Sequence, residues 1–261
     1  MNRFRFPRTA LIALTATLAL TACAGGGNDN DVIDRKYVAR DVATLYTLGR
    51  DTLERGRYKQ AAIIFDEVER QHPYSVWARR AQLMSAFSYY TAAEYQDAIG
   101  AAQRFLQLHP GNKSAPYAYY LIALSQYEQI EDVERDQATT LAALNSLTEL
   151  TRRYPNTKYA SDARLKIDLA RDHLAGKEME IGRFYQERRQ YIAAVKRFEN
   201  VVTTYDTTSH TPEALHRLVE CYLLLGIPQE ARRTAAVLSA NYPGSKWYER
   251  SYNLIQKHAS A

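Results

Sequence analysis

The chain has 261 residues, of which 34 are Lys or Arg and 29 are Asp or Glu, so its formal net charge is +5. Three of the basic residues, Arg3, Arg5 and Arg8, lie at the N-terminus, and the remaining 31 basic and 29 acidic residues leave a balance of only +2. This near-neutral balance argues against a nucleic-acid-binding protein, which normally carries a basic patch. Two cysteines, Cys23 and Cys221, are too few for a disulfide framework.

The N-terminus has the pattern of a bacterial export signal. Basic residues are followed by apolar or small residues from Thr9 to Ala22, and no acidic residue occurs before Asp29. The stretch is shorter than the roughly 20 apolar residues of a membrane span, so we do not expect a permanent transmembrane anchor. An ordinary cleaved signal peptide is the simplest alternative to the more specific interpretation that follows.

The signal ends in Leu20-Thr21-Ala22-Cys23, which resembles the lipobox of bacterial lipoproteins. The resemblance implies a lipoprotein signal peptide over residues 1–22, cleavage after Ala22, and N-palmitoyl and S-diacylglycerol groups on Cys23. Several acyl chains on one residue hold a protein firmly on a membrane. Residues 23–36 are rich in Gly, Asn and Asp and are expected to form a lipidated flexible tether.

Beyond the tether, the chain contains internal repeats. Five alanines are each followed twelve residues later by Pro or, once, by Asp: Ala61–Pro73, Ala98–Pro110, Ala143–Pro155, Ala194–Asp206 and Ala231–Pro243. Two repeats carry more of the tetratricopeptide (TPR) pattern, with Leu48-Gly49 before Ala61 and Phe65, and Ile181-Gly182 before Ala194 and Phe198. The sequence therefore predicts an all-α fold, a tetratricopeptide-repeat solenoid of about five helix pairs.

The repeat residues have a physical role in packing one helix of a pair on the other. The small residue lets two antiparallel helices approach, and the larger apolar residue one turn later fills the space beside it. Proline then ends the second helix, and Ser75, Thr157 or Ser245, two residues after a proline, can cap the next helix. Asp206 departs from this pattern, which leaves the exit geometry of the fourth repeat open but not the repeat itself.

The repeats are longer than the usual period of about 34 residues, because the alanines are spaced by 37, 45, 51 and 37 residues. The extra length predicts an acidic loop from Glu128 to Asp136 and one long helix from Thr157 to about Arg189, with Gly176 and Gly182 as candidate kinks. We expect an N-terminal TPR lobe of about three repeats over residues 37–156. A C-terminal lobe of about two repeats, with the long connecting helix, covers residues 157–261.

No pattern in the sequence indicates catalysis. The chain contains no Gly-x-Ser-x-Gly, no phosphate-binding glycine loop and no His-Glu-x-x-His. His210 and His216 are six residues apart, which is not the spacing of one helix face, so no metal site is expected. Cys221 lies in an apolar stretch and is expected to be buried. We therefore predict a binding protein with no catalytic residues, metal or cofactor.

The combined pattern resembles the BamD family, the lipoproteins of the outer-membrane β-barrel assembly (Bam) machinery. The resemblance covers nearly the whole mature chain and is strongest over residues 151–163, 172–175 and 180–188. It implies a lipid-anchored protein on the periplasmic face of the outer membrane, and Ala24 after the cysteine is compatible with that location. The implied partners are a BamA-like β-barrel insertase, other assembly lipoproteins and unfolded outer-membrane proteins, with no nucleic acid.

The resemblance also implies that the N-terminal repeats bind substrate and the C-terminal repeats hold the insertase. Tyrosine suits binding surfaces, and the chain has 20 tyrosines. The candidate substrate-binding residues are Tyr46, Tyr58, Trp77, Tyr89 and Tyr90. The simpler interpretation is that such tyrosines, as expected for Tyr58, Tyr95 and Tyr191, pack between helices.

Two alternative functions remain open. One is another periplasmic TPR scaffold that coordinates cell-envelope or pilus assembly. The other is a lytic or hydrolytic enzyme, which would need a catalytic Glu in a pocket supported by the repeats.

Overall fold

A computed structural model describes residues 41–133 and 135–259. The predicted signal peptide, Cys23 and tether lie outside these ranges. The described part is all-α, with eleven helices and no strand. The helices are α2 (Val42–Glu54), α3 (Tyr58–Gln71), α4 (Val76–Thr91), α5 (Tyr95–Leu108), α6 (Ala115–Tyr127), α7 (Ala138–Arg153), α8 (Lys158–Glu187), α9 (Tyr191–Thr204), α10 (Thr211–Leu224), α11 (Pro228–Asn241) and α12 (Lys246–Ala259).

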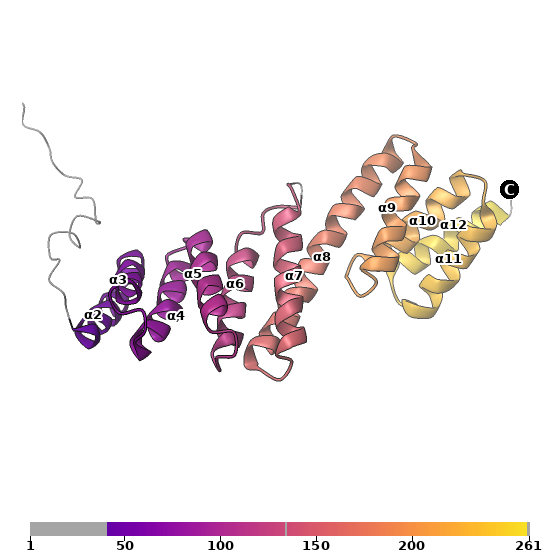
Figure 1. Cartoon of the computed structure of the whole chain (residues 1–261). Helices are drawn as coiled ribbons and strands as arrows, with labels where there is room; N and C mark the ends of the chain where they lie inside the picture. The colour runs from indigo at the N-terminus through magenta and orange to yellow at the C-terminus, as the bar shows by residue number, and fades with distance from the viewer. Residues whose placement is uncertain (1–40, 134, 260–261) are drawn as a thin grey trace, which may run out of the picture. The chain divides into compact units, whose positions relative to one another are not determined.

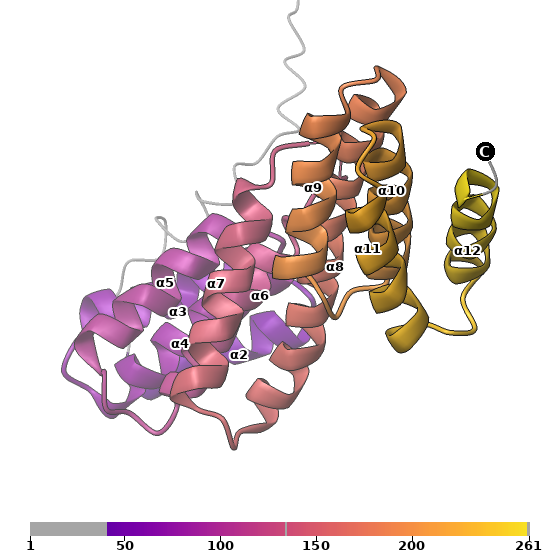
Figure 2. The same cartoon turned by 90° about the vertical axis from the view of Figure 1, so that its right-hand side faces the viewer.

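The helices form the five predicted pairs, α2/α3, α4/α5, α6/α7, α8/α9 and α10/α11. Each helix from α2 to α11 packs against the next one in the chain (Figure 1). The first helices of neighbouring pairs also touch, since α4 contacts both α2 and α6, and α6 contacts α8. After the last pair, α12 packs on α10 and α11. It is the last helix of the array, next to the C-terminus (Figure 2).

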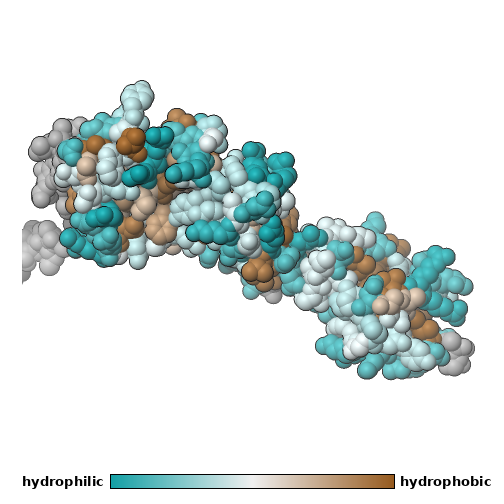
Figure 3. All heavy atoms as spheres, turned by 90° about the horizontal axis from the view of Figure 1, so that it is seen from below, coloured by the Kyte–Doolittle hydropathy of each residue, from teal (hydrophilic) through white to brown (hydrophobic). Residues whose placement is uncertain are grey.

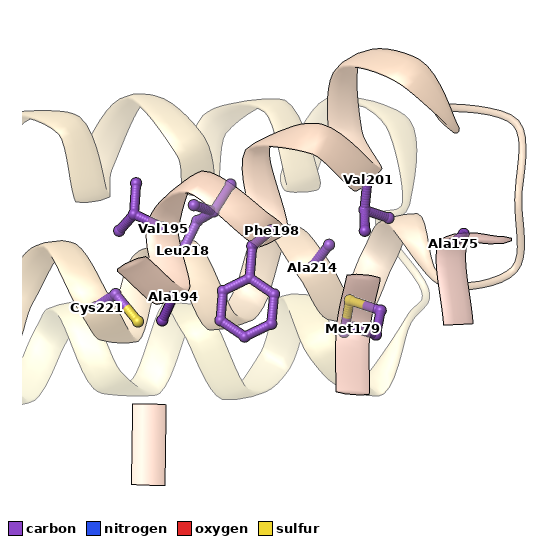
Figure 4. Close-up of a cluster of buried hydrophobic side chains, with 9 residues drawn as sticks. All are labelled: Ala175, Met179, Ala194, Val195, Phe198, Val201, Ala214, Leu218 and Cys221. Carbon is purple, nitrogen blue, oxygen red and sulfur yellow. The ribbon is translucent and has the colours of Figure 1, made fainter. Parts of the chain in front are cut away.

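Small residues lie where the two helices of a pair meet, as the repeat pattern predicts. All five repeat alanines have no exposed surface; they are Ala61, Ala98, Ala143, Ala194 and Ala231. Phe65, Phe105 and Phe198 are also almost completely buried. Figure 4 shows the ring of Phe198 among Ala194, Met179 and Ala214, which come from three different helices.

Turns within a pair need a residue in the left-handed conformation, which lets the chain reverse directly after the first helix. Four pairs have such a residue: Gly56 (φ 75°), Ala93 (φ 59°), Arg189 (φ 61°) and Gly226 (φ 75°). In the third pair, the longer segment from Glu128 to Gln137 replaces this turn.

The second helix ends as predicted. After three of the five pairs the next helix begins with a side-chain cap, whereas α6 and α10 begin without one. Ser75 Oγ accepts a hydrogen bond from Ala78 N (3.0 Å), and Thr157 Oγ1 accepts one from Ala160 N (3.2 Å). Ser245 Oγ accepts one from Tyr248 N (3.1 Å). Each cap satisfies a backbone donor that has no partner within its own helix.

The exit from the fourth repeat begins with the shared backbone conformation although Asp206 replaces proline. It is two residues longer than the exits at residues 72–75, 154–157 and 242–245, and α10 has no side-chain cap. Tyr205 (φ −121°, ψ 36°) is close in conformation to His72 (φ −135°, ψ 57°). Contacts from α8 support this exit: Arg171 Nη2 donates to Thr204 O (2.7 Å), and Ser209 N donates to Asp172 Oδ1 (2.9 Å). These bonds hold the segment that proline rigidifies elsewhere.

The predicted long helix is confirmed as α8, which has 30 residues. It runs uninterrupted through Gly176 and Gly182, both of which are buried. The glycines serve packing instead of interrupting the helix: a Cβ atom on Gly176 would lie 3.2 Å from His210 Nε2, and one on Gly182 would overlap the ring of Phe198. The division into two lobes at residues 156 and 157 stays a prediction.

The contacts of Gly49 with Phe65 and of Gly182 with Phe198 leave no room for an added methyl group. A Cβ atom on Gly49 would lie 2.8 Å from Phe65 Cε1, so we expect Gly49→Ala and Gly182→Ala to lower the free energy of unfolding by about 1–3 kcal/mol. Chemical denaturation measures the change. Gly100→Ala is the control, because its nearest neighbour would be 3.8 Å away and alanine favours a helix. Equal effects at all three positions would contradict this account.

Backbone conformation alone should decide the effect at the pair turns. Gly226→Ala is expected to destabilise by about 1 kcal/mol through left-handed strain, although no atom lies within 4 Å of its added Cβ. Ala93→Gly removes the same strain and should stabilise, or at worst leave stability unchanged. The melting temperature should therefore fall for Gly226→Ala and rise or stay unchanged for Ala93→Gly, and a rise for Gly226→Ala would contradict a strained turn.

Candidate functional site

The five predicted substrate-binding residues fall into separate environments on the first two repeats. Tyr46 of α2 and Trp77 of α4 form one aromatic pair, with ring centroids 4.9 Å apart. Tyr46 also contacts the buried ring of Phe65 at 5.4 Å. Arg80 lies over the Trp77 ring, 5.6 Å from its centroid. This pair is half-buried and leaves aromatic surface accessible on two first helices.

Tyr89 belongs to a polar network between the first and second repeats. Its hydroxyl donates to Asp66 Oδ2 (2.8 Å), and Ser85 Oγ donates to Asp66 Oδ1 (2.5 Å). Arg104 of α5 lies 3.6 Å from the same carboxylate. Burial raises the pKa of Asp66 and, together with the Asp66 charge, the pKa of Tyr89. The hydroxyl of Tyr89 is thus already engaged in joining helices.

Tyr58 and Tyr90 lie at other positions. Tyr58 begins α3 with 37% of its surface exposed, so it is less covered than the interhelical packing interpretation expected. Tyr90 is half-buried near the end of α4, where its ring lies 6.1 Å from Tyr95 and its hydroxyl is 3.4 Å from Glu128 Oε1. The structure therefore brings together Tyr46 and Trp77, whereas a substrate role for any of the five stays a prediction.

A cluster of tyrosines on α4, α6 and α8 contains one residue that the sequence analysis selected, Tyr90, and three that it did not. We call Tyr90, Tyr117, Tyr120 and Tyr159 the tyrosine face. The ring of Tyr159 lies 5.5 Å from that of Tyr117 and 5.1 Å from that of Tyr120. Tyr117 and Tyr120 are three residues apart, which puts them on one side of α6. That spacing was the available signal, but the sequence does not reveal that Tyr159 joins them.

Each phenol of the tyrosine face with a shifted pKa is shifted upward. Burial raises the pKa of Tyr117 to about 12, and burial together with Asp162 raises that of Tyr120. Burial and Glu128 raise the pKa of Tyr90 in the same way. These three hydroxyls stay neutral at physiological pH and remain able to donate hydrogen bonds.

The C-terminal repeats contain a polar cleft on α8 and α9. Its volume is about 680 Å³, and its lining includes Glu178, Tyr185, Lys196, Arg197 and Asn200. Arg197 Nη1 lies 3.2 Å from Glu178 Oε2, so an ion pair between two lining residues bridges the two helices. Ile192 at the start of α9 (67%) and Leu224 at the end of α10 (55%) are exposed. The face in Figure 3 is mostly hydrophilic, with hydrophobic residues in small scattered patches.

A second cleft, of about 370 Å³, lies where the predicted acidic loop meets α8 and the start of α10. Its lining includes Asp132 and Val133 from the loop, His173 and Gly176 from α8, and His210. A Cβ on Gly176 would lie 3.6 Å from Val133 Cγ1, so the absent side chain lets the loop approach the helix. Among the described residues, no group of three or more His, Cys, Asp or Glu side chains could hold a metal ion.

One arrangement has the parts of a hydrolytic triad. Ser251 Oγ lies 2.8 Å from His216 Nδ1, and His216 Nε2 lies 3.3 Å from Glu220 Oε1. Ser251 has no exposed surface and His216 has 4%, so a substrate cannot reach the hydroxyl. Ser251 lies on α12, whereas the other two residues lie on α10. The arrangement therefore attaches the last helix to the array.

Cys221 is fully buried, as expected, in the cluster around Phe198. Burial raises the pKa of its thiol to about 12. Because the thiolate is the reactive form, this cysteine is a poor nucleophile. No helix in the described ranges has the length and hydrophobicity needed to cross a bilayer.

The charge on Glu220 should make the α10–α12 attachment sensitive to acid. Burial raises its pKa, but hydrogen bonds from His216, Gln186 and Arg217 outweigh burial and lower the pKa to about 2. The stabilisation is present above the unfolded pKa of about 4.3 and is lost as the pH falls toward the folded pKa. At neutral pH, Glu220→Gln should lower the free energy of unfolding by about 1–3 kcal/mol.

Denaturation of the wild type and the variant over a range of pH tests this expectation. The free energies of unfolding of the wild type and of Glu220→Gln should converge in acid. Glu230 forms an exposed ion pair with Arg233 (2.7 Å), so Glu230→Gln should change the free energy of unfolding by less than about 1 kcal/mol. A gap that persists in strong acid would mean that the Glu220 charge is not its cause.

Comparison with known proteins identifies relatives over nearly the whole chain. A family model described as "YfiO: Outer membrane lipoprotein" matches residues 38–250. The outer membrane protein assembly factor BamD of Caulobacter vibrioides is 49% identical over 249 residues, which cover 95% of this chain and 81% of the relative. The protein of the same name from Rickettsia prowazekii is 44% identical over 94% of this chain and 95% of the relative. That of Neisseria meningitidis serogroup A is 33% identical over 93% and 94%, respectively.

Proposed function

Because this chain belongs to the YfiO family of outer membrane lipoproteins, we propose that it acts as a non-catalytic subunit of the outer-membrane β-barrel protein assembly complex. The observation that carries the proposal is the match to assembly factors named BamD along almost the entire chain. The family model spans residues 38–250, so it includes the five helix pairs and the beginning of α12.

The physical form of the molecule supports binding as its mode of action. Helix pairs that contact mainly their neighbours present extended surfaces, and such surfaces hold segments of other proteins. The aromatic pair Tyr46–Trp77 supports substrate binding by the N-terminal repeats. The polar cleft beside Arg197 and the exposed Ile192 support a partner site on the C-terminal repeats. We assign the first surface to unfolded outer-membrane proteins and the second to a BamA-like insertase with its associated lipoproteins.

The membrane location that we propose rests on the lipobox-like sequence from Leu20 to Cys23. We propose that Cys23 carries the N-palmitoyl and S-diacylglycerol groups and holds the protein on the periplasmic face of the outer membrane. The residues between Cys23 and the first described residue, Asp41, would then link the lipid to the helical array.

The anchor can be tested with the two cysteines of the chain. Cys23→Ser should abolish labelling by radioactive palmitate and release the protein from membranes, whereas Cys221→Ala should retain both labelling and membrane association. Labelling is measured on the purified protein, and membrane association by centrifugation. Undiminished labelling of Cys23→Ser would place the lipid elsewhere.

The function is tested by purifying the tagged, lipidated protein from membranes in mild detergent and identifying bound proteins by mass spectrometry. We expect a β-barrel insertase with periplasmic repeats among the recovered proteins. Its reproducible absence, with septal, peptidoglycan or pilus proteins in its place, would favour a different envelope scaffold. An envelope-hydrolysis assay on the same sample should show no activity.

A further inference from the structure

We propose that the tyrosine face binds an extended segment in which an aromatic residue lies near an Arg or Lys. This inference rests on the proposed function and specifies the kind of substrate segment that the function requires. It places a substrate contact on the third repeat and on α8, beyond the residues predicted from the sequence.

The rings of the tyrosine face come from the first helices of three successive pairs. Tyr90 belongs to α4, Tyr117 and Tyr120 to α6, and Tyr159 to α8. Tyr90 and Tyr117 pack against the same buried cluster, which includes Ala118. Because α6 contacts both α4 and α8, the four rings form one aromatic area. All four side chains are half-buried, so part of this area stays accessible. Such an area can stack with an incoming aromatic ring.

Two hydroxyls of this area have no hydrogen-bond partner among the described residues. Tyr120 donates to Asp162 Oδ2 (2.7 Å), and Tyr90 lies 3.4 Å from Glu128 Oε1, whereas the hydroxyls of Tyr117 and Tyr159 make no such bond. An unfolded chain carries main-chain carbonyl groups that need donors. The free phenols can therefore bind an extended backbone without regard to most of its sequence.

A carboxylate at one edge supplies charge complementarity. Glu128 is exposed and, among the described residues, forms no ion pair; Asp162, in contrast, is already paired with Lys166 (2.9 Å). Glu128 also caps the C-terminus of α6, where the helix dipole adds partial negative charge. A cationic side chain is thus favoured beside the rings. In an extended chain, residues two apart point to the same side and are separated by about 7 Å.

The test measures the affinity of the full-length protein in detergent for two fluorescent peptides. One contains the pattern aromatic-x-Arg within an otherwise polar, extended sequence, and the other has Gln in place of Arg. Tyr117→Ala and Tyr159→Ala should weaken binding of both peptides about three- to tenfold. Glu128→Gln should weaken binding of the Arg peptide about two- to fivefold and leave the Gln peptide unchanged.

Tyr119→Ala is the matched control. Tyr119 lies on the same helix, but its ring packs on Tyr154 (5.6 Å) and under Arg153 (5.4 Å), so its loss should not change affinity. Tyr117→Phe retains the ring and removes only the hydroxyl. It should weaken binding less than Tyr117→Ala does. If an alanine variant does not fold, Tyr117→Phe and Glu128→Gln still test the proposal.

Two results would overturn the inference while the proposed function stands. One is peptide binding by the wild type that none of the tyrosine-face variants reduces, and the other is an equal loss in Tyr119→Ala. If the wild type binds neither peptide nor any denatured β-barrel protein, substrate binding fails together with the inference. Recovery of the insertase in the purification experiment would still be an independent result.

Discussion

The structure depends on close contact between the two helices of each pair. Glycine or another small residue on one helix lies against a larger apolar side chain on the other. In the fourth pair, Gly182 lies against the ring of Phe198, and Ala194 is fully buried beside it. The same arrangement joins Gly49 to Phe65 in the first pair. Because interiors are packed as densely as organic crystals, these short distances determine where the neighbouring helix must lie.

Polar contacts then adjust the array where its repeats differ from one another. In the fourth repeat, the missing proline is offset by Arg171 and Asp172 of α8, which hold the chain between α9 and α10. The His216–Ser251 hydrogen bond fastens α12 to α10 in a comparable way. Both sets of contacts use side chains that could have been taken for functional groups. The first set holds the chain between α9 and α10, and the second is buried between α10 and α12, so both stabilise the fold.

The surfaces that we propose for binding lie on several repeats instead of in one enclosed pocket. Aromatic side chains lie on the first helices of the N-terminal and middle repeats, and a polar cleft lies between α8 and α9. An array of this kind can contact a partner and an unfolded substrate through different repeats at the same time. Such separate surfaces fit the role that we propose in an assembly complex.

The sequence by itself determined the helical class, the five pairs and the long helix α8, because small residues, prolines and capping hydroxyls recur at intervals set by helix geometry. Ala61, Pro73 and Ser75 carry this local information. Only the tertiary structure decided which side chains share a surface. Tyr89 is hydrogen-bonded to Asp66 and lies in a different environment from Trp77. The rings of Tyr117 and Tyr159 are in contact although 42 positions separate them in the sequence. Such pairings depend on the angle and distance between whole helices, which the contacts of many residues set together and no local pattern contains.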